Sequence, residues 1–414
     1  MIAKEFLIHH RQSADNIDVS VSLVSFWTKM QQGLNGRGGM PMIPTYLMNV
    51  DRSKIRSGEK HILIDAGGTN FRSALGYFDE QGNVVIEKQS KTVMPASDRL
   101  LSKSQFYNAI ASNIKSLLPD GKNIGFCFSY QVDMGEDLDG KVVMFSKEIQ
   151  APEVIGTQVG QETLAACMQY DSTKRKIVIL NDTVATLLGG MATNSEQFSA
   201  YLGYIYGTGT NVCYIEDTAK IGKVKYLPEG KMLVNTECGN FDGFEIGDFD
   251  KVVIGRTAVP DKQLFEKMTS GKYLSDIMYE ALRVAVCDGV LSDKTQLERF
   301  QLRDLTALFE DGDFVCKFNK KDRQRAIEIC KELIRRAAKM GAIVNSALAI
   351  ATCKDKSLPV AIVAEGTTFN KLPFYREFFE QYLTEILGAE GIRYKILQGE
   401  DLNLIGTLMS TMLL

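Results

Sequence analysis

The sequence predicts an α/β protein built from two similar halves. Short apolar segments rich in β-branched or aromatic residues alternate with longer segments of helical periodicity, as strands and helices do in such proteins. The chain has 414 residues, which suggests two or three domains at about 150 residues each. A strand, a glycine-rich turn containing Thr and Asn, and a second strand occur at residues 61–78 and again at 200–216. This repeat indicates a duplicated architecture.

The composition is that of an ordinary globular protein. Hydrophobic residues make up 45%, and 48 Lys and Arg against 51 Asp and Glu give a net charge of −3, so we expect no nucleic-acid partner. No apolar run approaches the length of about 18 residues that marks a membrane helix, and the first residues lack the pattern of a secretory signal. The eight cysteines form no C-x-x-C pair, which disfavours a zinc site and is typical of a reducing cytoplasm.

The first half is expected to begin with helices and to continue as a sheet. Apolar residues recur at helical spacing within residues 5–34, which predicts one or two helices. The turn around Asp137–Gly140 has the look of a calcium loop, but the loop register puts Gly135 and Ser146 where acidic residues are needed. We expect this turn to join two strands. Further strands are predicted at 61–65, 71–78, 84–87, 124–129 and 176–180, and helices at 100–118 and 157–169.

The second half is expected to repeat the strand–turn–strand pattern and then to be largely helical. The clearest helical periodicity runs over residues 322–352. No Ser- or Gly-rich linker separates the halves, so we expect closely joined domains. Strands are predicted at 200–206, 212–216 and 360–364, and helices at 373–387 and 402–414.

The first glycine-rich turn carries groups suited to phosphate chemistry. Its glycines allow backbone amides to approach a phosphate closely, its threonine and asparagine supply neutral hydrogen bonds, and its arginine supplies positive charge. Its aspartate ends a strand, where it could hold a magnesium-bound water. An ordinary hairpin turn is the alternative, and the glycine spacing is not that of a P-loop or of a dinucleotide-binding turn. The residues are Asp65, Gly67, Gly68, Thr69, Asn70 and Arg72.

The second glycine-rich turn contains Gly207, Thr208, Gly209 and Thr210. Taken alone, it is best explained as a hairpin turn. Paired with the first turn, it indicates that two phosphate-binding turns, one in each half, hold a nucleotide between two domains.

A third candidate, Asn181-Asp182-Thr183, directly follows a predicted buried strand. Ligands bind at the carboxyl ends of strands in open α/β sheets, so Asp182 could be a functional carboxylate. The alternative is that this segment caps the next helix, a position that Asp and Thr both favour.

Together these motifs resemble those of the hexokinase family, within the larger group of sugar kinases with the actin-like ATPase fold. The segments that carry the resemblance are Leu63–Arg72 (family pattern L-D-x-G-G-T-N-x-R), Phe126–Ser129 (F-x-F-S), Asn181–Thr186 (N-D-T-V-x-T), Gly207–Tyr214 (G-T-G-x-N-x-x-Y), Asn235–Phe241 (N-x-E-W-G-x-F) and Phe265–Leu274 (E-K-x-x-x-G-x-Y-L/M).

The chain departs from the family pattern in four places, one of which is Ser129-Tyr130-Gln131, where the family has Ser-Phe-Pro. Ser146-Lys147-Glu148-Ile149 stands where the family has T-K-G-F, and Cys238 stands where it has Trp. Glu365-Gly366-Thr367 only loosely matches the family's adenosine motif, D-G-S. These changes concern the sugar loop and the nucleotide rim, so they leave the reaction class intact and open the question of which hexose is preferred.

The resemblance implies two ribonuclease H-like domains, one small and one large, with a cleft between them. The small domain would comprise residues 62–180 plus 402–414, and the large domain 1–61 plus 181–401. The implied reaction is ATP-dependent, Mg²⁺-dependent phosphorylation of the 6-hydroxyl of a hexose, with glucose as the first candidate. The alternatives are a kinase for mannose, fructose or glucosamine, and a sugar sensor with little catalysis.

The resemblance also implies a role for each site residue. Asp182 would be the general base, and Asp65 would bind Mg²⁺ through water. The implied sugar ligands are Ser129, Ser146, Lys147, Asn181, Asp182, Asn211, Glu237 and Glu266. The implied ATP-binding residues are Asp65, Gly67, Gly68, Thr69, Asn70, Arg72, Gly207, Thr208, Gly209, Thr210, Gly366 and Thr367. Because the sugar ligands come from both halves, sugar binding is expected to draw the halves together.

Overall fold

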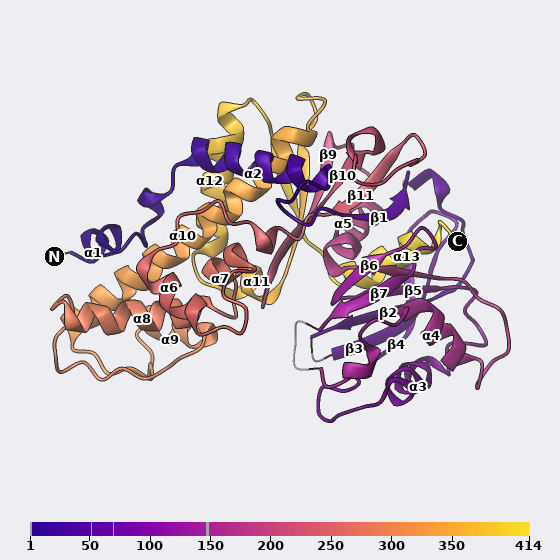
Figure 1. The fold of residues 1–414 in the computed structure, drawn as a ribbon, viewed down its shortest axis with the longest axis horizontal. Helices are drawn as coiled ribbons and strands as arrows, with labels where there is room; N and C mark the ends of the chain where they lie inside the picture. The colour runs from indigo at the N-terminus through magenta and orange to yellow at the C-terminus, as the bar shows by residue number, and fades with distance from the viewer. Residues whose placement is uncertain (1, 51, 69, 146–148) are drawn as a thin grey trace. The chain divides into compact units, whose positions relative to one another are not determined.

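The computed structural model describes residues 2–50, 52–68, 70–145 and 149–414 (Figure 1). The contacts within the chain divide it into two compact units. The predicted domains differ from these units at several boundaries and stay a prediction, because a densely packed unit need not be a domain that moves as one body. Unit 1 comprises Met1–Met42, Tyr204–Val212 and Thr236–Lys395, and unit 2 comprises Ile43–Gly203, Cys213–Asn235 and Ile396–Leu414.

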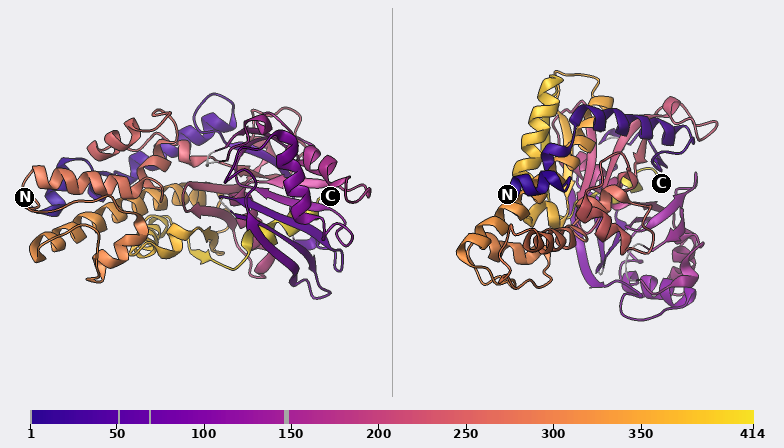
Figure 2. Two further views of the ribbon diagram at one scale, coloured as in Figure 1. Left: turned by 90° about the horizontal axis from the view of Figure 1, so that it is seen from below. Right: turned by 60° about the vertical axis from the view of Figure 1, so that its left-hand side comes forward.

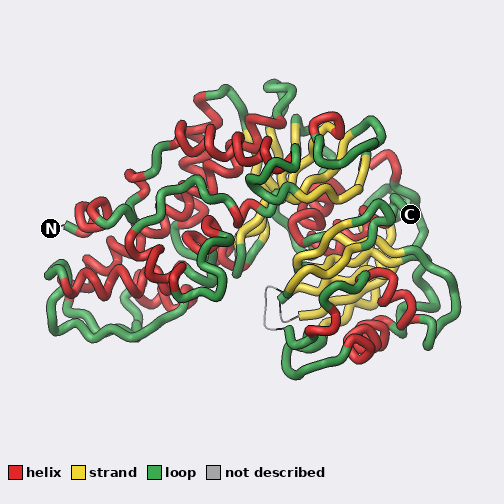
Figure 3. The backbone as a smooth tube through the Cα atoms, in the orientation of Figure 1, coloured by secondary structure: helices red, strands yellow, loops and turns green. Residues whose placement is uncertain are grey.

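A five-stranded sheet forms the centre of unit 2 (Figure 3). Its strand order is β4-β3-β2-β5-β8, in which β3 is antiparallel to both β4 and β2, and β5 and β8 run parallel to β2. Because parallel strands end at the same edge, the residues that follow β2, β5 and β8 gather at one edge of the sheet. The strands are β2 (His61–Gly67), β3 (Asn70–Phe78), β4 (Val84–Val93), β5 (Ile124–Phe128) and β8 (Ile177–Leu180).

Helices cover both faces of this sheet. Ile62 and Ile64 of β2 share an apolar core with α3 and α4, whereas Leu63 shares the opposite core with α5 and α13. Figure 2 shows α13, in yellow, beside the strands that it contacts. Since side chains alternate along a strand, Asp65 faces the same side as α5 and α13. The helices are α3 (Lys103–Ile114), α4 (Val159–Cys167), α5 (Asp182–Thr193) and α13 (Leu402–Thr411).

A six-stranded sheet has the order β1-β11-β10-β9-β12-β13. Without β1, this order repeats that of the five-stranded sheet, with the strands around the second glycine-rich turn in place of those around the first. The predicted duplication is therefore confirmed in the strand order. The strands are β1 (Ile43–Met48), β9 (Ala200–Tyr206), β10 (Thr210–Asp217), β11 (Lys231–Asn235), β12 (Val360–Glu365) and β13 (Tyr394–Leu397).

Most helices belong to unit 1, as the periodicity predicts. The longest, α10 (Lys320–Thr352), closely matches the predicted helix 322–352 and packs against α12, α1, α2 and α8. It buries an apolar stripe along its first half and is buried nearly all round in its second half. The others are α1 (Ala3–His9), α2 (Val19–Leu34), α6 (Asp248–Gly255), α7 (Leu264–Thr269), α8 (Leu274–Cys287), α9 (Leu305–Phe309), α11 (Thr367–Lys371) and α12 (Tyr375–Ala389).

The sequence patterns located most elements and missed three strands. The predicted helical segment 5–34 is two helices, because Asp18 caps α2 by accepting a hydrogen bond from the Val21 amide at 2.9 Å. β1, β11 and β13 were not predicted: they are short, and β1 contains Pro44, which lacks a backbone donor. Across the described residues, no helix combines the length and apolarity needed to cross a bilayer.

The turn around Asp137–Gly140, whose sequence has the look of a calcium loop, joins two strands, as predicted. These are β6 (Gln131–Met134) and β7 (Gly140–Met144). The Asp139 carboxylate accepts hydrogen bonds from the amides of Gly160 and Gln161, at 2.6 and 2.8 Å, in the first turn of α4. This acidic residue therefore stabilises a helix start.

His61, the first residue of β2, is a buried histidine that should make stability depend on pH. The residue is 1% exposed, and neither ring nitrogen has a hydrogen-bond partner among the described residues. Burial lowers its pKa from 6.5 to about 4, although the Glu59 carboxylate at 3.9 Å acts in the opposite direction. The fold thus favours the neutral imidazole, and this contribution is lost as the pH falls from about 6.5 towards 4.

We expect His61→Leu to make the free energy of unfolding depend less on pH below neutrality. Between pH 8 and pH 5, the parent protein should lose about 2 kcal/mol more unfolding free energy than the variant, because only the parent has a histidine that stays neutral when folded and takes up a proton when unfolded. Urea denaturation at both pH values measures this difference. The exposed His9, changed to Gln, is the matched control. Equal acid slopes for parent and His61→Leu would contradict the assignment.

Candidate active site

The first glycine-rich turn connects β2 to β3 in unit 2. Gly68 has a φ of 61°, in the left-handed region that glycine adopts readily. The Tyr130 hydroxyl donates a hydrogen bond to the Gly68 carbonyl at 3.1 Å. Asn70 is exposed, whereas Thr69 lies outside the described residues. The turn is held by a tyrosine, while both of its glycines keep partial exposure.

The Asp65 carboxylate is paired with Arg72 across the same two strands. Nε and Nη2 of Arg72 lie 3.0 and 2.5 Å from Asp65 Oδ2, and Nη1 lies 2.7 Å from Asp401 Oδ1. The guanidinium predicted to face phosphate is thus held between two carboxylates in this structure. Asp401 was missed because it directly precedes the apolar segment 402–414, where an acidic residue is expected as a helix start.

Asp65 and Asp182 lie at the same edge of the five-stranded sheet. Cys127 lies on β5, between β2, which contains Asp65, and β8, which Asp182 follows. Burial raises the pKa of the Cys127 thiol, and the nearby charges of Asp65 and Asp182 raise it further. Ser129, just beyond β5, donates its backbone amide to the Ala66 carbonyl at 3.1 Å. Two carboxylates and a serine therefore gather where the strands end.

Asn181, and not Asp182, caps α5. Asn181 Oδ1 accepts hydrogen bonds from the amide and hydroxyl of Thr183 at 3.0 and 2.5 Å. Asp182 is the first residue of the helix, where the helix dipole stabilises a negative charge. Asp182 Oδ1 also accepts a hydrogen bond from the Thr183 amide, at 2.9 Å, but the N-cap position that could have explained Asp182 belongs to its neighbour. Two other predicted sugar ligands, Ser146 and Lys147, lie outside the described residues.

The second glycine-rich turn, in unit 1, contacts Glu266 of α7. Glu266 Oε2 accepts a hydrogen bond from the Thr210 amide at 3.2 Å. A Cβ atom on Gly209 would lie 2.5 Å from the same oxygen, so any larger residue there would displace the Glu266 carboxylate. The turn closes on itself, with the Gly207 amide donating to the Gly209 carbonyl at 2.9 Å.

Glu237 and Asn211 lie together near this turn. Asn211 Nδ2 donates to Glu237 Oε1 at 3.2 Å, and Asn211 Oδ1 accepts from the Cys238 amide at 3.3 Å. Glu237 has a φ of 50°, an uncommon conformation for a residue with a side chain and one that is enriched at functional sites. Burial raises the pKa of the Cys238 thiol to about 12, so it is a small neutral group here.

The segment Gly366–Thr367 also lies against the second turn. A Cβ atom on Gly366 would be 2.2 Å from the Tyr206 carbonyl, which explains the glycine. Thr367 is exposed. The sequence patterns missed two further contacts of this turn, because backbone groups make them: the amides of Gly271 and Lys272 donate to the carbonyls of Gly207 and Thr208 at 2.9 and 3.2 Å.

The donor groups fit a magnesium nucleotide. Mg²⁺ prefers oxygen ligands and is usually bound by one or two carboxylates together with phosphates and water. Asp65 supplies such a carboxylate, and among the described residues there is no cluster of three or more potential ligands that would make a closed protein site. Each glycine-rich turn, taken by itself, offers small residues, hydroxyls and amides of the kind that suit phosphate oxygens.

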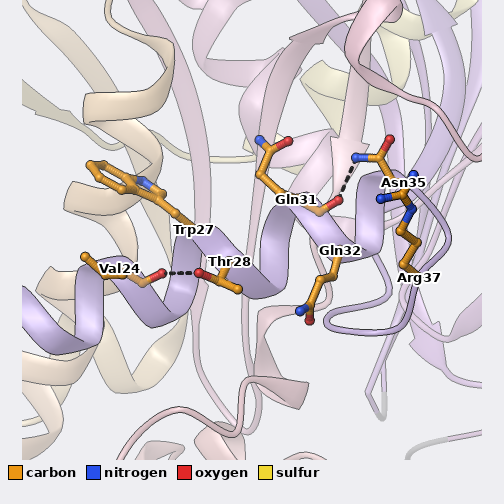
Figure 4. Close-up of a pocket in the computed structure, with 7 residues that line it drawn as sticks. All are labelled: Val24, Trp27, Thr28, Gln31, Gln32, Asn35 and Arg37. Carbon is orange, nitrogen blue, oxygen red and sulfur yellow. Dashed lines mark hydrogen bonds between the residues drawn. The ribbon is translucent and has the colours of Figure 1, made fainter.

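A pocket elsewhere in unit 1 is lined by none of the candidate site residues named above. It lies on α2 and is lined by Val24, Trp27, Thr28, Gln31, Gln32, Asn35 and Arg37 (Figure 4).

Models of the family described as hexokinase match residues 5–192 and residues 201–413. The chain belongs to the hexokinase family. It is 28% identical to hexokinase-7 of Oryza sativa subsp. japonica, over 87% of this chain and 86% of that protein. It is 29% identical to hexokinase-1 of Nicotiana tabacum, over 87% and 80% of the two chains.

The fold agrees with this assignment. The structure of a hexokinase from Schistosoma mansoni complexed with glucose matches with a TM-score of 0.81 at 21% identity, covering 99% of this chain and 100% of that one. The predicted family, its actin-like fold and its enzymatic class as a hexokinase are thereby confirmed.

Proposed function

We propose that this hexokinase transfers the γ-phosphoryl group of MgATP to the 6-hydroxyl of glucose, in the cytoplasm. The observation that supports it best is the position of Asp182, which lies two residues after β8, at the same edge of the sheet as Asp65, while Asn181 occupies the N-cap position of α5. In support of the substrate, a structural neighbour of this chain is described as complexed with glucose.

In the proposed reaction, this chain's residues mainly orient the reactants and stabilise charge, which is most of what phosphoryl transfer requires. The Asp182 carboxylate orients the 6-hydroxyl and accepts its proton. Asn181 keeps its amide group for a sugar hydroxyl, because its oxygen is occupied by the helix start. Ser129, Asn211, Glu237 and Glu266 are the other described sugar ligands, with Ser146 and Lys147 as further ones.

The nucleotide is assigned to the two glycine-rich turns and the Gly366–Thr367 segment. MgATP, when bound, supplies the phosphoryl group and a cation that neutralises its charge. Asp65 would hold that cation through water. Arg72, held between Asp65 and Asp401 without nucleotide, supplies positive charge beside the first turn.

A coupled assay of ADP formation across a panel of hexoses tests this function. We expect glucose to give the highest kcat/KM, because carboxylate and amide ligands together can pair each of its hydroxyls. Mannose, fructose and glucosamine are the comparison substrates, since the altered segment 146–149 and Cys238 concern sugar selection. A higher kcat/KM for one of these would change the substrate, and no phosphorylation of any hexose would leave a sugar sensor.

A further inference from the structure

The Thr368 hydroxyl makes a contact with the second glycine-rich turn that no pattern in the sequence indicates. Thr368 Oγ1 donates a hydrogen bond to the Gly207 carbonyl at 2.9 Å. Thr368 is the second residue of α11 and directly follows the Gly366–Thr367 segment assigned to the nucleoside. One hydrogen bond thus joins the nucleoside side of unit 1 to its phosphate turn.

The space that the Thr368 hydroxyl occupies is available because residue 271 is a glycine. A Cβ atom on Gly271 would lie 2.4 Å from Thr368 Oγ1 and 2.7 Å from the Gly207 carbonyl oxygen. The Gly271 amide donates to the same carbonyl at 2.9 Å. The absence of a side chain at residue 271 therefore allows two donors to converge on the Gly207 carbonyl, one from a backbone amide and one from a side chain.

The base of the turn is held by packing. The ring of Tyr206 stacks on that of Tyr375 at a centroid distance of 4.0 Å, and its hydroxyl donates to the Thr269 carbonyl at 2.6 Å. These two contacts hold Tyr206, the residue directly before the turn. Thr368 and Gly271 hold the first carbonyl of the turn, that of Gly207. A hydrogen bond that fixes the orientation of one peptide group also restricts the next amide, which is part of the surface offered to a phosphate.

We propose that Thr368 is a positioning residue that holds the Gly207–Thr210 turn in the conformation that binds the phosphates of the nucleotide. The inference rests on the proposed function and deepens it, because it assigns part of the nucleotide affinity to a side chain that does not touch the hexose. Thr367 contacts the nucleoside, and Thr368 orders the turn for the phosphates.

Thr368→Val tests the proposal, because valine keeps the shape of threonine and removes the donor. We expect the Kd for MgADP, measured by calorimetry, and the KM for MgATP to rise about 2- to 10-fold, the usual range for one lost hydrogen bond. The KM for the hexose should stay within about two-fold. Thr368→Ser, which keeps the hydroxyl, should restore the parent values.

The matched control is Thr352→Val. Thr352 is also a half-buried threonine of unit 1 whose hydroxyl donates to a backbone carbonyl, that of Leu348 at 2.7 Å, but it lies at the end of α10. Its Kd for MgADP should equal that of the parent. Thr368→Ala serves as a second variant without the donor if the valine variant does not fold.

Amide hydrogen exchange provides a readout without nucleotide or activity. Peptides that cover residues 204–211 should exchange faster in Thr368→Val than in the parent protein, and at parent rates in Thr368→Ser. Unchanged exchange, an unchanged Kd for MgADP, or a serine variant as weak as the valine variant would each overturn the proposal. Failure of the proposed function would look different: the parent protein itself would phosphorylate no hexose.

Discussion

Replacement of Asp182 by asparagine is expected to lower the turnover of hexose phosphorylation by about 10²- to 10⁴-fold, the usual contribution of a general base. Asparagine has nearly the same shape and still forms hydrogen bonds, so much of the sugar affinity should persist. The helix start should also persist, because Asn181 provides the cap of α5. Steady-state kinetics and thermal unfolding of the same preparation measure both quantities.

Asp248→Asn is the matched control for this experiment. Asp248 is the first residue of α6, as Asp182 is of α5, and it is exposed at 49% of its side chain. Its replacement should leave turnover close to the parent value. A folded Asp182→Asn protein that phosphorylates its hexose within a few-fold of the parent rate would remove Asp182 from the mechanism.

Replacement of Glu237 or Glu266 by alanine is expected to weaken sugar binding about 10- to 150-fold. Each variant removes a charged acceptor for sugar hydroxyls, which is worth roughly 1.5–3 kcal/mol. Nucleotide affinity should change less, although Glu266→Ala also removes the acceptor of the Thr210 amide. Titration calorimetry with the preferred hexose and, separately, with MgADP distinguishes the two effects.

Glu310→Ala, at an exposed glutamate of unit 1, is the control for the loss of one negative charge. Its affinity for the hexose should equal that of the parent protein. If both Glu237→Ala and Glu266→Ala bound the hexose as tightly as the parent, the sugar ligands assigned to unit 1 would be wrong.

The local features of the fold and of the site could be predicted because neighbouring residues determine them. The short run of consecutive apolar residues before Asp65 predicts a buried strand, and a carboxylate directly after a later buried strand predicts a functional group at the carboxyl edge of a sheet. That Asp65 and Asp182 both lie close enough to Cys127 to raise the pKa of its thiol is known only from the structure.

The choice between Asn181 and Asp182 as the helix cap could not be made from the sequence. Both residue types favour the capping position, and both stand before the same helix. Both side chains accept a hydrogen bond from the Thr183 amide, so only the backbone conformation decides which residue is the N-cap. The structure shows Asn181 as the N-cap and Asp182 inside the helix.

The sequence by itself determined the family, the two glycine-rich turns, the duplicated order of strands and the candidate base Asp182, because these depend on residue type at short spacing. Only the tertiary structure decided the partners of these groups. Arg72 pairs with Asp401 across 329 positions, and Thr368 reaches Gly207 across 161. Such contacts form only when separate strands and helices pack against one another. The distance between the two residues therefore depends on the packing and cannot be inferred from their spacing in the sequence.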